Sequence, residues 1–339
     1  MHDCDCPLST TYCDKLNRAM TPALVKFCKD TPSHRSRLYR DPIKKAEKKF
    51  STDVSEERFL KIHDINAACY SIMQKVDIGS VSAVLGFPRS GMIPASIISC
   101  YLSLPLLTLD DDLNIINIRK GIRPIKDIKG KILVVDDTYT SGRQLKKFRN
   151  KVENADFIFS ACFCPEKKLH ELDVVGTVHN SGWLLSWNLF SNPTFIEKCA
   201  FDLDGIMCPD VTNEIYLDED RYIKHMSDSK PLYEMTPTIA KCHSIVTARL
   251  EEYRDLTEEW LNKNNVSYGQ LHMYQKDKQY RDSDFINIIS KYKSSIFVNS
   301  DARIFVESDD LLAKRIAARS KGKRVICPDS GKAYYVKRV

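Results

Sequence analysis

Two pairs of carboxylates in this 339-residue chain directly follow strand-like apolar runs. The first pair, Asp136 and Asp137, comes after Ile132–Val135 and before a hydroxyl-rich turn that closes at Gly142. Backbone N–H groups of such a turn, together with the start of the next helix, can converge on a phosphate dianion. The turn adds three hydroxyl donors, those of Thr138, Thr140 and Ser141. Two acids would repel the phosphate, so we expect them to hold the 2′- and 3′-hydroxyls of a ribose.

A second phosphate-binding loop is indicated at Val84–Ala95, with the sequence VLGFPRSGMIPA. A strand pattern ends at Gly86, and a helix pattern begins after Gly91. Small residues let backbone approach a pyrophosphate group, and Arg89 brings positive charge. The pattern alone is weak evidence, but it precedes the acid pair by 50 residues, counted from Gly86 to Asp136.

In this order, the two loops resemble the type I phosphoribosyltransferase family, whose motif for phosphoribosyl pyrophosphate (PRPP) is a strand, an acid pair and a T-x-T/S-G loop. The resemblance implies a catalytic mechanism of positioning and charge stabilisation, with Mg²⁺ on the pyrophosphate. No residue is identified as a general base. The implied PRPP-binding residues are Arg89, Ser90, Gly91, Asp136, Asp137, Thr138, Tyr139, Thr140, Ser141 and Gly142.

The same resemblance implies two further elements. A flap over the substrate corresponds to Leu109–Pro124, where a basic solvated hairpin is the alternative; its cations are Arg119, Lys120 and Arg123. A hood corresponds to Gly182–Phe190, where Trp183 or Trp187 would stack on the base. Packing of both tryptophans in the core is the alternative.

The second pair of carboxylates is Asp202 and Asp204 in the sequence FDLDG. Alternate residues of an extended segment point the same way, so the two side chains can share one site. Asp202 would attack phosphorus, and Asp204 would protonate the leaving alkoxide and later activate water. Thr247, at the end of the strand-like SIVTAR, is suited to hold the transferring phosphoryl group.

With Lys293 and the acidic IFVESDD, this order resembles the haloacid dehalogenase (HAD) superfamily of phosphatases. The resemblance implies Mg²⁺ as cofactor, and its spacing favours Lys293 over Lys276, Lys278 and Lys291. Ile206 and the acids Glu307, Asp309 and Asp310 depart from the usual pattern, which leaves the metal-binding carboxylates open. A phosphatase fold without activity is the alternative. The favoured metal ligands are Asp202, Asp204, Glu307 and Asp310.

Strand and helix patterns alternate through most of the chain, which predicts the α/β class with two parallel-type sheets. The first sheet is expected to be phosphoribosyltransferase-like and the second HAD-like and Rossmannoid. A helical pattern is expected over Glu56–Val76, and a break falls at Asn192-Pro193. The expected organisation is an appended segment over 1–50, a phosphoribosyltransferase-like domain over 51–195 and a HAD-like domain over 196–339.

Composition excludes several classes. Only 12 glycines argue against a flexible or collagen-like polymer. The longest apolar run, Ser96–Leu109, is too short to span a membrane. Twelve cysteines in a long chain without a signal peptide predict reduced thiols in a cytoplasmic protein. Zinc binding and scattered thiols are the two interpretations of an N-terminal group that comprises His2, Cys4, Cys6, Cys13 and Cys28.

The chain therefore resembles fused phosphoribosyltransferase–HAD proteins over residues 55–339. We expect a bifunctional enzyme that makes a nucleotide monophosphate from PRPP and a nucleobase-like acceptor, then removes its phosphate. One alternative is a PRPP- or nucleotide-sensing module with a phosphatase output, and another is a nucleic-acid end phosphatase. A net charge of +6, with 51 basic and 45 acidic residues well mixed, disfavours nucleic acid as a partner. The oligomeric state is open, and a homodimer is among the options.

Overall fold

The computed structural model describes residues 12–13, 18–19, 53–119, 130–152, 156–275 and 283–337. Of the first 50 residues, it describes only the backbone of β1 (Tyr12–Cys13) and β2 (Arg18–Ala19), which pair antiparallel. The side chains of the N-terminal cysteines therefore lie outside the described residues. So do Lys120, Arg123 and the side chain of Arg119 in the predicted flap.

A six-stranded sheet forms the N-terminal lobe, in the order β6-β5-β4-β7-β8-β9. All neighbours are parallel except β6, which runs antiparallel to β5. Helices α4 (Ile62–Lys75) and α5 (Met92–Leu102) cover one face, and α6 (Arg143–Arg149) covers the other. The strands are β4 (Val81–Gly86), β5 (Leu106–Leu109), β6 (Ile115–Arg119), β7 (Lys131–Thr138), β8 (Phe157–Cys164) and β9 (Val174–Val178).

The sheet of this lobe has an apolar core on each face, and alternate side chains of β7 point into the two cores. Leu133 and Val135 pack with α4 and α5, whereas Val134 between them packs with Leu145 and Phe148 of α6. A strand that is buried on both faces has to be apolar at successive positions, which is why Ile132–Val135 shows no polar alternation. The acid pair therefore stands at the carboxyl end of a central, fully covered strand.

An eight-stranded sheet forms the C-terminal lobe, in the order β10-β3-β16-β15-β14-β11-β12-β13. Helices α12 (Ser283–Asn299) and α13 (Asp310–Arg319) pack on one face, and α11 (Arg254–Lys263) packs on the other. The strands of its parallel part are β11 (Cys199–Phe201), β12 (Cys242–Leu250), β13 (Tyr268–Tyr274), β14 (Ile304–Val306) and β15 (Arg324–Cys327). Because β11 is internal, the acids that follow it emerge at the middle of the sheet.

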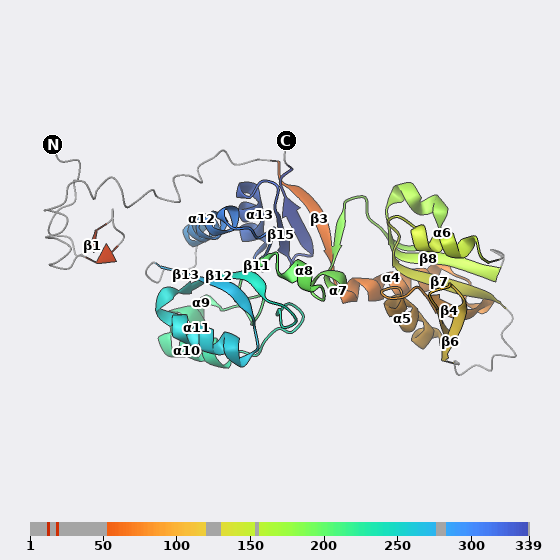
Figure 1. Ribbon diagram of the computed structural model, residues 1–339, viewed down its shortest axis with the longest axis horizontal. Helices are drawn as coiled ribbons and strands as arrows, with labels where there is room; N and C mark the ends of the chain where they lie inside the picture. Colours follow the sequence, from red (N-terminus) through yellow and green to blue (C-terminus); the bar gives the residue numbers. More distant parts are fainter. Residues whose placement is uncertain are drawn as a thin grey trace.

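Two strands that precede residue 196 belong to this second sheet. β3 (Ser55–Leu60) pairs antiparallel with β16 (Lys332–Tyr335), and β10 (Trp183–Leu185) pairs parallel with β3. Figure 1 shows β3, in orange, beside the blue strands of the C-terminal end. The chain thus enters and leaves the N-terminal lobe through the sheet of the C-terminal lobe.

The helix predicted over Glu56–Val76 begins later than expected. Ser55–Leu60 is the strand β3, and the helix occupies Ile62–Lys75 only. Phe59 and Leu60 fit a helical stripe in the sequence, but they are buried in different cores, one in each lobe. Pairing with the free edge of β16 therefore outweighs the local helical pattern, since tertiary contacts override propensity.

Short helices join β10 to β11 and extend the second lobe. They are α7 (Ser186–Leu189), α8 (Pro193–Ile196), α9 (Asn213–Leu217) and α10 (Glu219–Asp228). Helix α7 lies between the lobes (Figure 1). The predicted α/β class with two sheets is confirmed. Within the described ranges, no helix has the length and apolarity that a membrane crossing requires.

Candidate active sites

Asp137 in the N-terminal lobe is already engaged by the protein. Its side chain lies at the end of β7, and the residue is only 3% exposed. Its Oδ1 accepts a hydrogen bond from the Thr138 amide at 2.8 Å, and its Oδ2 accepts one from Nε1 of Trp187 at 2.9 Å. A residue of the predicted hood therefore covers one of the two predicted ribose-binding acids.

Asp136 shares that corner with the other phosphate loop. Burial and the charge of Asp137 raise the pKa of Asp136 to about 8. A Cβ on Gly91 would lie 2.8 Å from the Phe87 carbonyl oxygen and 3.0 Å from Oδ1 of Asp136. Only glycine leaves room there, so the absence of a side chain at Gly91 lets the two predicted loops meet.

Fewer backbone N–H groups of the turn after the acids are free to bind a phosphate than the sequence predicts. The amide of Thr138 donates to Asp137, and that of Tyr139 donates to the Phe163 carbonyl at 2.8 Å. Among the described residues, the amides of Thr140, Ser141 and Gly142 have no partner, and both hydroxyl side chains of this trio are exposed. These groups remain available to a ligand.

Tyr139 packs inside the lobe under the turn and is not directed toward a ligand. Its ring is buried, and its hydroxyl donates to Oε2 of Glu171 at 2.7 Å. Gly142 has φ +66° and packs directly on this ring, so a side chain there would be both strained and obstructed. The glycine that closes the motif is therefore required by the tyrosine beneath it.

The predicted pyrophosphate loop reaches the hood through Arg89. This exposed side chain donates from Nη2 to Oδ1 of Asn188 in α7 at 2.9 Å, and the neighbouring Ser90 is half-buried. Asn188 was not predicted, and only its place beside Trp187 in the hood points to it. Trp183 packs half-buried on the core of the N-terminal lobe, with its ring edge against His179.

In the C-terminal lobe, two of the predicted acids meet around the predicted lysine. Nζ of Lys293, on α12, lies 2.6 Å from Oδ2 of Asp202 and 2.7 Å from Oε2 of Glu307. All three residues are buried. Asp202 follows β11 and Glu307 follows β14, two neighbouring parallel strands, so their carboxyl ends bring the acids together. Residues far apart in sequence form one compact charged cluster.

Burial and the neighbouring charges together determine the titration of this cluster. Burial and the charge of Glu307 raise the pKa of Asp202, against the opposing effect of Lys293. Burial would lower the pKa of Lys293, but the charges of Asp202 and Glu307 raise it above its usual range. The lysine is therefore fixed as a cation between two acids.

Asp204 faces a different partner, Arg249. Nε of Arg249 donates to Oδ2 at 2.9 Å, and Nη2 donates to Oδ1 at 2.7 Å, in a fully buried bidentate pair. Burial opposes ionisation, but the charge of Arg249 and hydrogen bonds lower the pKa of Asp204 well below its usual range. The carboxylate is thus held ionised, a state that accepts a proton.

Arg249 was not predicted as a site residue. The feature of the sequence that could have identified it is its position two residues after Thr247 on β12. Residues at this spacing in a strand direct their side chains to the same side. Thr247 is buried, and its Oγ1 accepts a hydrogen bond from the Arg249 amide at 3.1 Å. The tripeptide Thr-Ala-Arg therefore supplies both residues.

A cavity of about 190 Å³ opens over this cluster, and most of the predicted catalytic and metal-binding residues line it. Asp310 is not part of it, because its Oδ1 accepts a hydrogen bond from Tyr334 Oη at 2.6 Å. The neighbouring Asp309 lines the cavity and caps α13. The lining includes Asp202, Asp204, Asp210, Thr247, Lys293, Glu307, Ser308 and Asp309.

The charge balance of this cavity suits a divalent cation. Five carboxylates line it, and the cations paired with them are Lys293 and Arg249. Asp202 and Glu307 share one lysine and still repel each other. Carboxylate oxygens are the ligands that Mg²⁺ prefers, so the donor set fits the predicted ion.

No protein-family model matches the chain, and no curated protein matches it in sequence. Among solved structures, a purine phosphoribosyltransferase from Pyrococcus horikoshii shares 16% identity over 38% of this chain and 92% of its own, with a TM-score of 0.29. A Helicobacter pylori xanthine-guanine-hypoxanthine phosphoribosyltransferase shares 20% identity over 40% and 99%, also with a TM-score of 0.29.

A third similar structure covers more of the chain. A chain of a Pnkp1/Rnl/Hen1 complex shares 14% identity over 80% of this chain and 87% of its own, with a TM-score of 0.29. Likenesses at this TM-score are too weak to assign a fold or an activity to this chain.

Proposed function

We propose that the chain is a bifunctional enzyme that transfers phosphoribose from PRPP to a nucleobase-like acceptor and hydrolyses the phosphate ester of the product. The observation that carries the proposal is the buried cluster of Asp202, Lys293 and Glu307, which lines one cavity with Thr247. Such a cluster is suited to transfer of a phosphoryl group to an aspartate.

Hydrolysis proceeds in two steps. An oxygen of Asp202 attacks phosphorus, the bond from phosphorus to the ester oxygen breaks, and the leaving alkoxide takes a proton. Water then attacks the aspartyl phosphate and gives inorganic phosphate and the free carboxylate. Lys293 balances charge on the phosphoryl oxygens, and the Thr247 hydroxyl donates a hydrogen bond to one of them.

Asp204 is ionised, as the second step requires, but Arg249 lowers its pKa and so weakens it as a base. To accept the proton of the attacking water, its carboxylate has to loosen the contact with Arg249. Donating a proton in the first step requires the carboxyl group to leave Arg249 and become protonated. Mg²⁺ would neutralise charge on the transferring group, and Asp202 and Glu307 would be the carboxylates that hold it.

In the N-terminal lobe, the proposed PRPP site combines the free amides of Thr140, Ser141 and Gly142 with the acids of β7. Phosphate oxygens accept hydrogen bonds from such amides and from the exposed hydroxyls. Arg89 brings positive charge from the other loop. For both ribose hydroxyls to bind carboxylates, Trp187 has to release Asp137 and Asp136 has to ionise.

A second candidate function follows from that requirement. In a PRPP- or nucleotide-sensing module, ligand binding would displace Trp187 from Asp137, and the phosphatase would be the only activity. The hydrogen bond between Trp187 and Asp137 favours this candidate, because it occupies an acceptor position on the acid that a ribose hydroxyl would use.

One experiment separates the two candidates. The full chain is incubated with PRPP, Mg²⁺ and a panel of nucleobases, and pyrophosphate and phosphate are measured separately. Base-dependent pyrophosphate release that is lost in Asp137→Asn supports the transferase. PRPP binding without pyrophosphate release, over the whole panel, supports the sensor. No release of phosphate from any nucleotide monophosphate would overturn the phosphatase half of the proposal.

A further inference from the structure

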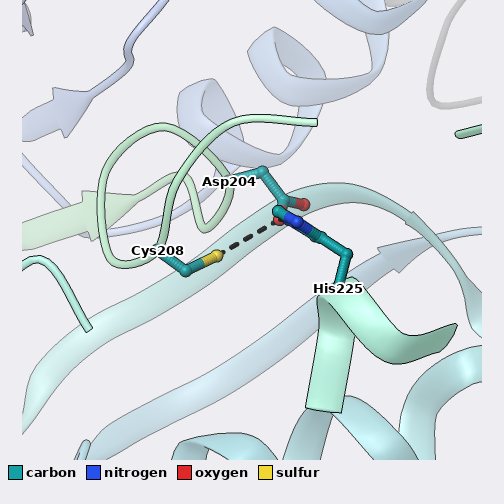
Figure 2. Close-up of side chains that lie close together, drawn as sticks. All are labelled: Asp204, Cys208 and His225. Atoms are coloured by element: carbon teal, nitrogen blue, oxygen red, sulfur yellow. Dashed lines mark hydrogen bonds and ion pairs between the residues drawn. The ribbon is translucent and has the colours of Figure 1, made fainter. Parts of the chain in front are cut away.

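A group of three metal-ligating side chains lies behind the proposed phosphatase site. One ligand atom each of Asp204, Cys208 and His225 lies within 4.8 Å of the other two, in the part of the chain that the structure describes. Figure 2 shows the three side chains pointing toward one another from the loop after β11 and from α10. Carboxylate, thiol and imidazole are the donors of tetrahedral zinc sites.

The distances suit one ion. Sγ of Cys208 lies 3.2 Å from Oδ1 of Asp204, and Nε2 of His225 lies 3.5 Å from the same oxygen. Ligands about 2.0–2.3 Å from a tetrahedral Zn²⁺ are separated from each other by roughly 3.3–3.7 Å. The observed separations are therefore close to those of a preformed site.

The loop that carries Cys208 is fixed by its backbone. The Gly205 amide donates to the Cys208 carbonyl at 2.8 Å, and the Cys208 amide donates to the Leu203 carbonyl at 3.3 Å. Gly205 has φ +80°, a conformation that glycine adopts without strain. The thiol is thus held beside Asp204 by a tight turn.

His225 is the independent indication of a ligand. Its side chain is only 10% exposed, and Nε2 is buried without a hydrogen-bond partner. Nδ1 lies 3.3 Å from Oγ of Ser229. Histidines that bind metals commonly use one ring nitrogen for the ion and donate from the other to a fixed acceptor. Ser229 can therefore orient the ring with Nε2 directed at the site.

Arg249 limits which ions can bind. Its Nη2 lies 2.7 Å from Oδ1 of Asp204 and 3.3 Å from Sγ of Cys208. An ion at Oδ1 displaces this contact, whereas the bond from Nε to Oδ2 can remain. The thiol also has to release its proton, because the thiolate is the form that binds a metal ion. Only an ion that binds thiolate strongly meets both conditions, which favours Zn²⁺ over Mg²⁺.

We propose that Asp204, Cys208 and His225 form an inhibitory binding site for Zn²⁺ or a similarly thiophilic divalent ion. On binding, the thiol proton goes to solvent, a metal–sulfur bond forms, and no redox step occurs. The inhibition rests on the proposed phosphatase function, because the ion occupies the carboxylate that activates water. The binding itself does not depend on that function.

Cobalt(II), which substitutes for zinc and has visible spectra, tests the site in the full chain. A background with Cys4, Cys6, Cys13 and Cys28 changed to serine removes the other predicted zinc ligands. Besides any Co²⁺ that the carboxylates of the cavity hold, we expect one Co²⁺ per chain with a sulfur-to-metal charge-transfer band. Zn²⁺ added in slight excess should abolish this band, because it takes the same site.

Substitutions assign the ligands. Cys208→Ser should abolish the charge-transfer band, and His225→Ala should weaken Co²⁺ binding by about 100-fold or more. Ser229→Ala should weaken binding by about 10- to 100-fold, as expected for a group that orients a ligand. Cys100→Ser, an exposed cysteine in α5, is the matched control and should keep the band. Cys208→Ala provides a second variant, and the circular dichroism of each variant reports on its folding.

The results separate the two proposals. Asp202→Asn should lose phosphatase activity and keep the charge-transfer band, so failure of one proposal leaves the other measurable. In the active chain, the Zn²⁺ concentration that halves phosphate release should rise at least tenfold in His225→Ala. A band that survives in folded Cys208→Ser, or no band in the parent chain, would overturn the proposed site.

Discussion

The two candidate sites differ in the partners that their carboxylates contact. In the C-terminal lobe, the acids pair with cations fixed inside the same lobe, Lys293 and Arg249. In the N-terminal lobe, Asp137 is covered by Trp187 from α7, and Asp136 is mostly neutral at pH 7 because its pKa is about 8. The first site is assembled before substrate arrives, whereas the second has to rearrange. A preassembled site suits simple hydrolysis, and a covered site suits control by ligand binding.

The largest expected effect tests the preassembled site. Asp202→Asn should lower phosphate release by roughly 10⁴-fold or more, because it removes the nucleophile. Pyrophosphate release should persist, so a nucleotide monophosphate should accumulate, which chromatography of the products can measure. Asp220→Asn, an exposed acid in the first turn of α10, should keep the full rate of phosphate release. Equal loss in both variants would contradict the assignment.

The second test concerns the ion pair behind the site. Arg249→Ala leaves Asp204 buried without its cation, so the free energy of unfolding should fall by about 3–5 kcal/mol. Arg254→Ala, which removes an arginine that is 33% exposed and pairs with Glu251 and Glu258, should cost less than about 1 kcal/mol. Urea unfolding of both variants measures the difference. Similar losses would mean that burial of the Arg249 pair matters little.

The same pair predicts a pH dependence of stability. The pKa of Asp204 is lowered from its ordinary value of 3.8, so the stabilisation is fully present above that pH and is lost as the pH falls further. Arg249→Ala should therefore be less sensitive to acid than the parent chain below pH 4. Urea unfolding at a series of pH values checks the sign.

The covered site is tested by Trp187→Phe, which keeps an aromatic ring and removes the indole donor. If Trp187 competes with ribose for Asp137, the affinity for PRPP should rise about tenfold or more, the scale of one hydrogen bond to a charged group. Calorimetric titration with PRPP measures this change, and Trp183→Phe is the matched control. A fall in affinity would instead show that Trp187 orients Asp137 for the ligand.

The smallest expected effect is the pH dependence of PRPP binding. With a pKa of about 8, Asp136 is mostly protonated at pH 7 and mostly ionised at pH 9. If only the carboxylate accepts a ribose hydroxyl, the affinity should rise by about tenfold over this range. Asp136→Asn should remove that rise. A rise that persists in the variant would assign the titration to another group.

Local patterns were sufficient for most of the elements. The strand pattern that ends at Gly86 and the helix pattern that begins after Gly91 match the end of β4 and the start of α5, because apolar period and flanking breakers agree there. They were insufficient for β3, whose Phe59 and Leu60 continue a helical stripe in the sequence, and for β16, which depends on pairing with strands far away in the chain.

In the candidate sites, too, some residues could be found from local patterns, whereas others depend on contacts between distant parts of the chain. Asp202 and Glu307 were recognisable because they follow strands, and Lys293 because of its spacing. Thr247 was predicted at the end of a strand, but β12 continues past it to Leu250; the structure nevertheless brings all four residues to one cavity. The pairing of Trp187 with Asp137 spans 50 residues, and that of Arg249 with Asp204 spans 45. No local pattern encodes such contacts, since they depend on how elements that are distant in sequence pack together.

The strands β3 and β10 make the two lobes topologically interdependent. A fragment that starts at residue 196 would lack both strands and would expose the edge of β16. Such an exposed edge can pair with a strand of another chain and so promote aggregation. A fragment that ends at residue 195 would keep β3 paired with β10 but would lose β16, the strand that joins this pair to the rest of the sheet. Exchange of the N-terminal lobe for another would therefore have to preserve this strand pair.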